Sequence, residues 1–313
     1  MTPEVNKIIH ADALEGLKQL PDECVDMIMT SPPYWSLRSY ESDGQIGIED
    51  DFLEYINRLI DVFTEAKRVL KDTGTAFINI ADTYGGSGHG YINNYKKHKQ
   101  RYTFQDGINK TENLVNTAFN KSMLMLPQRF SIAMVDSGWK CRNVIIWNKP
   151  NQIPQSVTDR FTNDFEYIFF FTKRNKYNFT QQFEPYDKPL DRWGGDTLQA
   201  DGASEWSQAT GQKAYRNRNL RPNPEGRNMR AVWSINTRGE KEKHYATYPQ
   251  ELVARCIRSG CPEGGTVLDP FMGSGTTAVV ARKLNRNYIG FDLNPQYCKL
   301  AERKLRRELG LFK

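Results

Sequence analysis

The stretch Thr266-Val-Leu-Asp-Pro-Phe-Met-Gly-Ser-Gly-Thr276 has the pattern of an apolar strand that enters a glycine-rich turn and then a helix. Gly273 and Gly275 lack Cβ atoms, so the main chain there can approach a ligand and direct amide groups toward it. About twenty residues further on, Tyr288-Ile-Gly-Phe-Asp292 ends a second strand in a carboxylate, a position from which an acid binds ribose hydroxyls. The combination predicts a nucleoside site in an α/β domain.

A second informative stretch, Thr30-Ser-Pro-Pro-Tyr-Trp35, follows the apolar run Val25–Met29, which is typical of a buried strand. Two prolines fix φ and remove backbone donors, so the carbonyl groups before them stay free to accept hydrogen bonds. Ser31 adds another oxygen, and Tyr34 and Trp35 add flat faces. This combination suits a planar group that carries amino hydrogens. The alternative is a proline turn that caps a strand, with both aromatic rings in the core.

Strand and helix patterns alternate along much of the chain. From Phe52 to Leu70 apolar residues recur at helical spacing, and Gly74 precedes a strand at Thr75–Ile80. Alternation of this kind predicts a mostly parallel sheet with helices on both faces. Further strands are expected at Lys7–His10, Asn143–Trp147, Phe165–Thr172 and Asn287–Leu293, and further helices at Ala13–Leu20, Lys121–Asp136, Pro249–Ser259, Thr276–Leu284 and the basic carboxyl-terminal segment.

Two segments interrupt this alternation. Tyr84–Lys110 has four closely spaced glycines, Gly85, Gly86, Gly88 and Gly90, ahead of its basic residues, and we expect a surface loop that contacts phosphate. A dinucleotide fingerprint is disfavoured because no acid ends a second strand at the proper distance. Asn175–Lys243 is polar and without clear periodicity, and is either a solvated insertion or, as its interleaved arginines and aromatic residues favour, a recognition module. The candidate DNA-binding residues in these segments are Lys96, Lys97, Lys99, Arg101, Arg216, Arg218, Arg221, Arg227 and Arg230.

Composition limits the remaining possibilities. The 313 residues include 43 Lys and Arg against 37 Asp and Glu, a net charge of +6 that fits a polyanionic partner without proving one. The five cysteines and four histidines show no metal-ligand spacing, so we expect reduced thiols and no metal site. No apolar run approaches the ~20 residues that cross a bilayer, and the amino terminus lacks a signal-peptide pattern. These features predict a cytoplasmic protein.

With both motifs placed, the chain resembles the amino-group DNA methyltransferases that use S-adenosylmethionine. Ser31-Pro-Pro-Tyr34 resembles their catalytic tetrapeptide, and Asp269-Pro-Phe-Met-Gly-Ser-Gly275 resembles their cofactor loop. The order, with the catalytic motif first and the cofactor loop last, is similar to the permuted beta class. The resemblance covers most of residues 5–175 and 244–305. It implies a Rossmann-like sheet of seven strands, mostly parallel with one antiparallel strand, and divides the chain into a catalytic part (1–174), a target-recognition region (175–243) and a cofactor-binding part (244–313).

The resemblance also implies roles for individual residues. Ser31, Pro32, Pro33 and Tyr34 form the catalytic group. The segment His244-Tyr-Ala-Thr-Tyr-Pro249 corresponds to the one that holds the methionine end of the cofactor, and Asp12 to the acid near its adenine. Asp269 suits a cofactor contact as well as a turn or helix cap. The full cofactor-binding set is Asp12, Thr30, His244, Thr247, Pro249, Asp269, Pro270, Phe271, Gly273, Ser274, Gly275, Thr276, Asp292 and Leu293.

The first residue of the tetrapeptide bears on the target base. Relatives with Ser at this position usually methylate N4 of cytosine, whereas Asp is commoner in adenine-N6 enzymes, so Ser31 favours cytosine in duplex DNA and leaves adenine-N6 as the alternative. A C5-cytosine mechanism is disfavoured because the chain has no Pro-Cys dipeptide to present a nucleophile. A DNA-binding regulator that transfers nothing is a further alternative, and an oxidoreductase would leave the tetrapeptide without a task.

The resemblance leads us to expect a particular mechanism and a particular biological setting. Ser31 Oγ and the Pro32 carbonyl are expected to accept the hydrogens of the target amine, while Tyr34 stacks on a base that has been flipped out of the duplex. The setting is a bacterial or phage restriction-modification system, with a cognate restriction endonuclease as a possible partner. The oligomeric state, monomer or homodimer, is left open.

Overall fold

The computed structural model describes residues 3–36, 44–86, 114, 117–186, 223–237 and 248–310. Its centre is an eight-stranded sheet in which β5 is antiparallel to both neighbours and the remaining neighbours pair in parallel. The strand order is β1 (Lys7–His10), β10 (Asn287–Asp292), β9 (Thr266–Asp269), β2 (Val25–Thr30), β3 (Leu70–Ile80), β5 (Phe165–Thr172), β4 (Lys140–Asn148) and β8 (Val232–Ser234).

The mostly parallel sheet and its one antiparallel strand agree with the sequence-based expectation, but the number of strands does not. The additional strand is β8, which pairs in parallel with the outer side of β4 in the register Trp147↔Trp233. Its three residues are too few to show alternation, and they lie in a segment that we expected to be irregular. Edge pairing with β4 therefore makes a strand where local sequence gives no signal.

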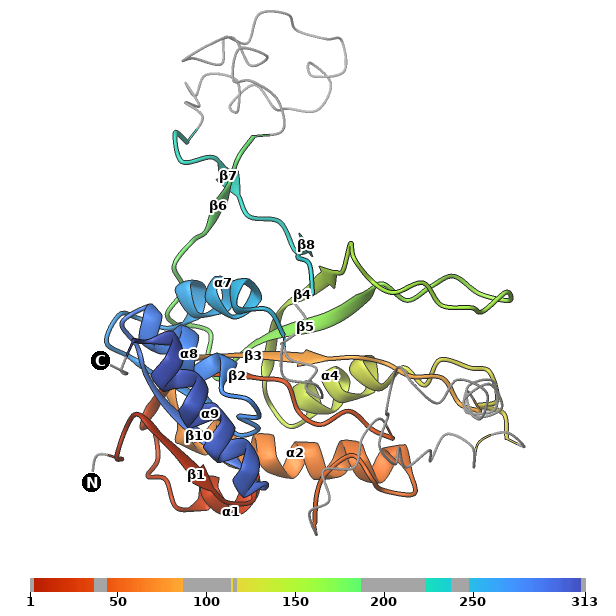
Figure 1. Cartoon of the computed structure of the whole chain (residues 1–313), viewed down its shortest axis with the longest axis horizontal. Helices are drawn as coiled ribbons and strands as arrows, with labels where there is room; N and C mark the ends of the chain where they lie inside the picture. Colours follow the sequence, from red (N-terminus) through yellow and green to blue (C-terminus); the bar gives the residue numbers. More distant parts are fainter. Residues whose placement is uncertain are drawn as a thin grey trace, which may run out of the picture. The chain divides into compact units, whose positions relative to one another are not determined.

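Helices cover both faces of the sheet (Figure 1). On one face α2 packs against α1 and α4, and Tyr55 and Phe63 of α2 share a buried core with Ile28 and Leu268 of the sheet. On the other face α8 packs against α7 and α9. All six residues of β2 are buried, as expected for a strand covered on both sides. The helices are α1 (Ala13–Lys18), α2 (Phe52–Val69), α4 (Leu126–Asp136), α7 (Gln250–Gly260), α8 (Thr276–Lys283) and α9 (Pro295–Glu308).

The chain divides into two compact units. The first consists of Met1–Thr180 and Ala231–Lys313, and the second is Gln181–Arg230, in which β6 (Phe183–Glu184) and β7 (Arg227–Asn228) form a short antiparallel ribbon. The second unit lies within residues 175–243, and the assignment of that region to target recognition stays a prediction. Within the described part of the chain, no helix has the length and apolar character needed to cross a membrane.

Candidate active site

The two sequence motifs meet at one edge of the sheet. β2 and β9 are parallel neighbours in the register Ile28↔Leu268, so both end at the same edge. There Thr30 Oγ1 donates a hydrogen bond of 2.6 Å to Asp269 Oδ1, although the two residues are 239 positions apart in the sequence. The serine-proline segment that follows Thr30 and the glycine turn that follows Asp269 are thereby joined at a single location.

Asp269 is the centre of a buried hydrogen-bond network. Its side chain is fully buried, and burial raises the pKa of its carboxyl group while the surrounding donors oppose that shift. Oδ1 also accepts from the Phe271 amide at 3.1 Å, and Oδ2 accepts from Tyr248 at 3.1 Å and from Thr277 Oγ1 at 2.5 Å. The contacts observed are those of a turn cap and a cross-link between segments. A cofactor contact of Asp269 stays a prediction.

The glycine turn shows why its two glycines are needed. Gly275 has φ +81°, and a Cβ there would lie 2.7 Å from Ala301 Cβ, so α9 packs directly on the turn. Gly273 has φ +54°, and the nearest atom to a Cβ there would be Phe271 O at 3.9 Å. Close packing within the protein therefore explains Gly275, whereas the space beside Gly273 is compatible with a ligand.

Asp292 ends β10 as the sequence predicts, beside the glycine turn. Oδ2 accepts a hydrogen bond of 2.8 Å from the Gly273 amide, and Oδ1 accepts one of 2.9 Å from the Asn294 amide. Burial raises the pKa of Asp292 to about 6, and the two amide donors only partly offset that effect. The adjacent strand β1 ends in His10, whose Nε2 lies 3.0 Å from the Leu293 carbonyl oxygen. The Asp292 carboxylate is thus hydrogen-bonded directly to the glycine turn.

Asp12 lies at the same edge as the amino-terminal cap of α1, where Oδ1 accepts from the Leu14 and Glu15 amides at 2.9 and 3.1 Å. Pro249 occupies the corresponding cap position of α7. Ser274 of the glycine turn and Thr276, the first residue of α8, are buried, and Pro270 and Phe271 precede the turn.

The tetrapeptide Ser31-Pro-Pro-Tyr34 directly follows β2. Pro32 is buried, and Tyr55 of α2 donates a hydrogen bond of 2.9 Å to the Pro33 carbonyl. Within the described residues, no hydrogen bond to the Pro32 carbonyl is present. The Tyr34 hydroxyl reaches across the sheet edge to Glu166 Oε2 of β5 at 2.8 Å.

Two of the predicted DNA-binding arginines form ion pairs within the protein, and nine other predicted residues lie outside the described residues. Arg227 and Arg230 form ion pairs with Glu184 at 2.7 and 2.6 Å within the second unit, so both guanidinium groups have a protein partner. Their contact with DNA stays a prediction. The predicted residues that lie outside the described residues are His244, Thr247, Lys96, Lys97, Lys99, Arg101, Arg216, Arg218 and Arg221.

The structure adds polar residues that sequence analysis missed. Lys304 of α9 is buried, and Nζ bonds Thr276 Oγ1 at 3.0 Å and Ser274 Oγ at 3.3 Å. Asp82 follows β3, and its Oδ2 is buried without a hydrogen-bond partner among the described residues. A polar residue inside an apolar strand pattern was the available signal for Asn79 in β3 and Glu166 in β5. Tyr248 lies in the segment that the resemblance assigns to the cofactor, but no local pattern indicated its hydrogen bond to Asp269.

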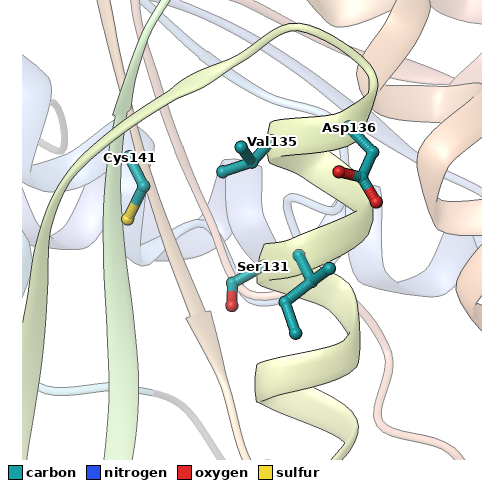
Figure 2. Close-up of a pocket in the computed structure, with 5 residues that line it drawn as sticks. Ser131, Val135, Asp136 and Cys141 are labelled. Carbon is teal, nitrogen blue, oxygen red and sulfur yellow. The ribbon is translucent and has the colours of Figure 1, made fainter.

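A small pocket lies outside this site, between α4 and β4 (Figure 2). Its volume is about 180 Å³, and it is lined by Ser131, Ile132, Val135, Asp136 and Cys141. None of these residues belongs to the sheet edge where the two motifs meet.

Comparison with known proteins agrees with this geometry. The model of a family described as DNA methylase, covering N6- and N4-methyltransferases, matches residues 25–303. Type II methyltransferase M.SmaI of Serratia marcescens is 38% identical over 302 residues, which are 96% of this chain and 91% of that protein. Type II methyltransferase M.Cfr9I of Citrobacter freundii is 36% identical over 301 residues, which are 96% of this chain and 88% of that protein.

Solved structures share the fold. PvuII DNA methyltransferase, described as cytosine-N4-specific, has a TM-score of 0.59 at 16% identity and covers 99% of this chain and 93% of its own. A putative DNA modification methylase from Thermus thermophilus, complexed with S-adenosyl-L-methionine, has a TM-score of 0.58 at 22% identity, with 98% and 97% covered. The chain therefore belongs to the family of N6- and N4-directed DNA methylases and is a site-specific, S-adenosylmethionine-dependent DNA methyltransferase of the Type II restriction-modification kind.

Proposed function

We propose that this methyltransferase acts on the exocyclic N4 of cytosine in duplex DNA. The observation that carries the proposal is the position of Ser31, the first residue of the tetrapeptide, one residue beyond the Thr30–Asp269 hydrogen bond. A neutral hydroxyl at this position, rather than a carboxylate, is the feature that the resemblance associates with cytosine. The cofactor loop lies on the neighbouring strand, so base and methyl donor would meet at this edge.

The residues of the sheet edge fit the cofactor. Asp292 supplies a carboxylate at the end of β10, and the space beside Gly273 allows close approach of a ligand. Pro249, the amino-terminal cap of α7, and Thr276, the first residue of α8, border the same region. When bound, S-adenosylmethionine supplies the electrophilic methyl group. In our proposal, Asp292 accepts from the ribose hydroxyls and the glycine turn orients the rest of the cofactor.

The exocyclic amine is a poor nucleophile because its lone pair is delocalised into the ring. Ser31 Oγ and the Pro32 carbonyl would accept the two amine hydrogens and thereby favour a pyramidal nitrogen in the transition state. Tyr34 would stack on the flipped base, and alignment of the two reacting groups supplies most of the acceleration. The excess amine proton would leave to Ser31 or to water after methylation, so no strong general base is required.

We further propose that residues 175–243 recognise the target sequence, and that this region and the basic loop of 84–110 contact phosphate groups. Such contacts offset the cost of flipping the base, which is about a few kcal/mol. A cognate restriction endonuclease would accompany the enzyme. If so, DNA isolated from cells that express this protein resists cleavage by an endonuclease of the same specificity, and unmethylated DNA does not.

Analysis of product nucleosides tests the target atom. Duplex DNA is methylated with labelled cofactor by the purified protein and digested to nucleosides, which are separated and weighed. We expect the label on N4-methyldeoxycytidine, and position mapping of the same DNA gives the sequence context. Label on N6-methyldeoxyadenosine would overturn the cytosine proposal and leave the family membership intact.

Cofactor affinity should depend on pH through Asp292. The pKa of about 6 means that acidification protonates this carboxylate in the free enzyme, and a protonated acid loses acceptor capacity for ribose hydroxyls. Affinity therefore falls as pH decreases. If only the ionised form binds, the dissociation constant rises about tenfold between about pH 7 and about pH 5.

Calorimetric titration of S-adenosylmethionine across this pH range measures the effect. His10, Asp269 and Cys298 are neighbouring titratable groups, and His10→Gln is measured in parallel and should keep the pH dependence. Asp292→Asn should bind more weakly and lose it. An affinity that increases on acidification would contradict the assignment of Asp292 to the cofactor.

A further inference from the structure

The Tyr34 hydroxyl lies in a row of polar groups that includes residues of strands β3 and β5. It contacts Glu166 Oε2 of β5 at 2.8 Å and Asn79 Oδ1 of β3 at 3.2 Å. Asn79 Nδ2 donates to the same Glu166 oxygen at 2.9 Å and to the Tyr167 carbonyl at 3.1 Å. Asn79 is 1% exposed. In a largely buried row of this kind each donor needs an acceptor, so the hydrogen bonds constrain one another's direction.

The far end of the row carries a charge pair. Lys149, at the end of β4, forms an ion pair with Glu166 Oε1, and both side chains are nearly buried, 13% and 12% exposed. The Lys149 ammonium also lies 4.5 Å from the ring centroid of Trp147. Glu166 thus receives donors from Lys149, Tyr34 and Asn79. An ionised carboxylate only accepts hydrogen bonds, so Glu166 fixes the orientation of every donor around it.

The orientation of the Tyr34 hydroxyl proton determines the orientation of the Ser31 hydroxyl proton. A phenol has one proton, and the shorter contact to a charged acceptor places it toward Glu166. Burial and the charge of Glu166 raise the pKa of Tyr34 well above its usual value, so the phenol keeps that proton. The phenol oxygen is then an acceptor for Ser31 Oγ, which lies 3.3 Å away and donates to it. With its single proton directed to Tyr34, Ser31 faces the opposite side with lone pairs only.

We propose that Glu166, acting through Tyr34, sets the direction of the Ser31 hydroxyl so that Ser31 Oγ meets the target amine as a hydrogen-bond acceptor. The proposal rests on the proposed function, which makes Ser31 an acceptor for the amine. Glu166 is a positioning residue in this arrangement, since it acts on Ser31 through Tyr34. If the hydrogen bonds from Glu166 through Tyr34 to Ser31 ran in the opposite direction, the Ser31 hydroxyl would present its proton to the amine hydrogens and oppose the reaction.

A double-mutant cycle tests the proposal. Tyr34→Phe removes the phenol oxygen and keeps the ring for stacking, and Glu166→Gln removes the charge at nearly constant volume. We expect each single change to lower kcat by about tenfold, the effect of losing one hydrogen bond to a charged group, with little change in KM for DNA or in cofactor affinity. Because both residues act on Ser31 through the same series of hydrogen bonds, the double variant should be no slower than Tyr34→Phe alone.

Matched controls separate this role from general damage. Tyr177→Phe removes an exposed phenol oxygen that contacts Arg142, and Glu251→Gln removes an exposed partner of Arg255 within α7; both should keep wild-type kcat. Thermal midpoints of all variants are measured, and Tyr34→Phe decides the outcome if Glu166→Gln fails to fold. Wild-type kcat in Tyr34→Phe, or a double variant whose loss is the product of the two single losses, would overturn the proposal.

Ser31→Ala distinguishes failure of this inference from failure of the proposed function. In the Ser31→Ala background, Tyr34→Phe should cause no further loss of kcat, because the hydroxyl that it orients is gone. If Ser31→Ala itself keeps full activity, the acceptor role of Ser31 is wrong and the proposed mechanism fails with it. If Ser31→Ala is impaired and Tyr34→Phe is not, only the positioning role of Glu166 is wrong.

Discussion

Ser31→Ala is expected to lower kcat by about a hundredfold or more while DNA and cofactor still bind. The change removes one of the two oxygens proposed to accept the amine hydrogens, and loss of one preorganised transition-state hydrogen bond costs about 10²–10³ in rate in comparable sites. The serine side chain is small and lies beyond the end of β2 rather than within it, so the fold should tolerate alanine. Single-turnover transfer of labelled methyl groups, with DNA affinity measured separately, provides the test.

Ser131→Ala is the matched control. Ser131 lies on α4, its hydroxyl donates to the Gln128 carbonyl within the same helix, and alanine favours helices, so activity should be unchanged. A Ser31→Ala enzyme that keeps wild-type single-turnover rates would rule out Ser31 as an acceptor. A loss that appears only in DNA affinity would assign the residue to binding instead.

Asp269→Ala is expected to cause the largest loss of stability. The change leaves the buried hydroxyls of Thr30, Tyr248 and Thr277 without their shared acceptor, and each lost bond to a charged group is worth about 1.5–3 kcal/mol. Removing a buried carboxylate also relieves its desolvation cost, and Tyr248 and Thr277 can still bond each other. We therefore expect a net loss of about 3 kcal/mol in the free energy of unfolding, less than the sum of the bonds.

Denaturant unfolding measures this loss, and Asp72→Ala is the control. Asp72 is solvent-exposed, and its ion pairs with Lys173 and Arg174 are screened by water and contribute little to stability. Asp269→Asn should lie between the two, because the amide keeps one acceptor oxygen. Equal stability of Asp269→Ala and the wild type would show that the network is not what joins β2 to β9.

The fold was largely predictable because its strands and helices carry strong local patterns. The apolar run before Ser31, the helical spacing from Phe52 and the glycine turn after Asp269 all lie where the structure has the corresponding elements. Element ends were less accurate: β3 begins at Leu70 rather than Thr75, because pairing with β2 extends it past the expected turn. The strand β8 had no local signal, since only pairing with β4 makes it a strand.

The sequence by itself determined the two motifs, their order and the strand ends that carry them, because hydrophobic periodicity and glycine placement act over a few neighbouring residues. Only the tertiary structure decided which polar side chains meet at the sheet edge. Asp269 gathers Thr30 and Tyr248, and Glu166 gathers Tyr34 and Lys149, from segments far apart in the chain. Such contacts depend on strand order and register, because a buried polar group must find its partner across the sheet, and no local pattern encodes that choice.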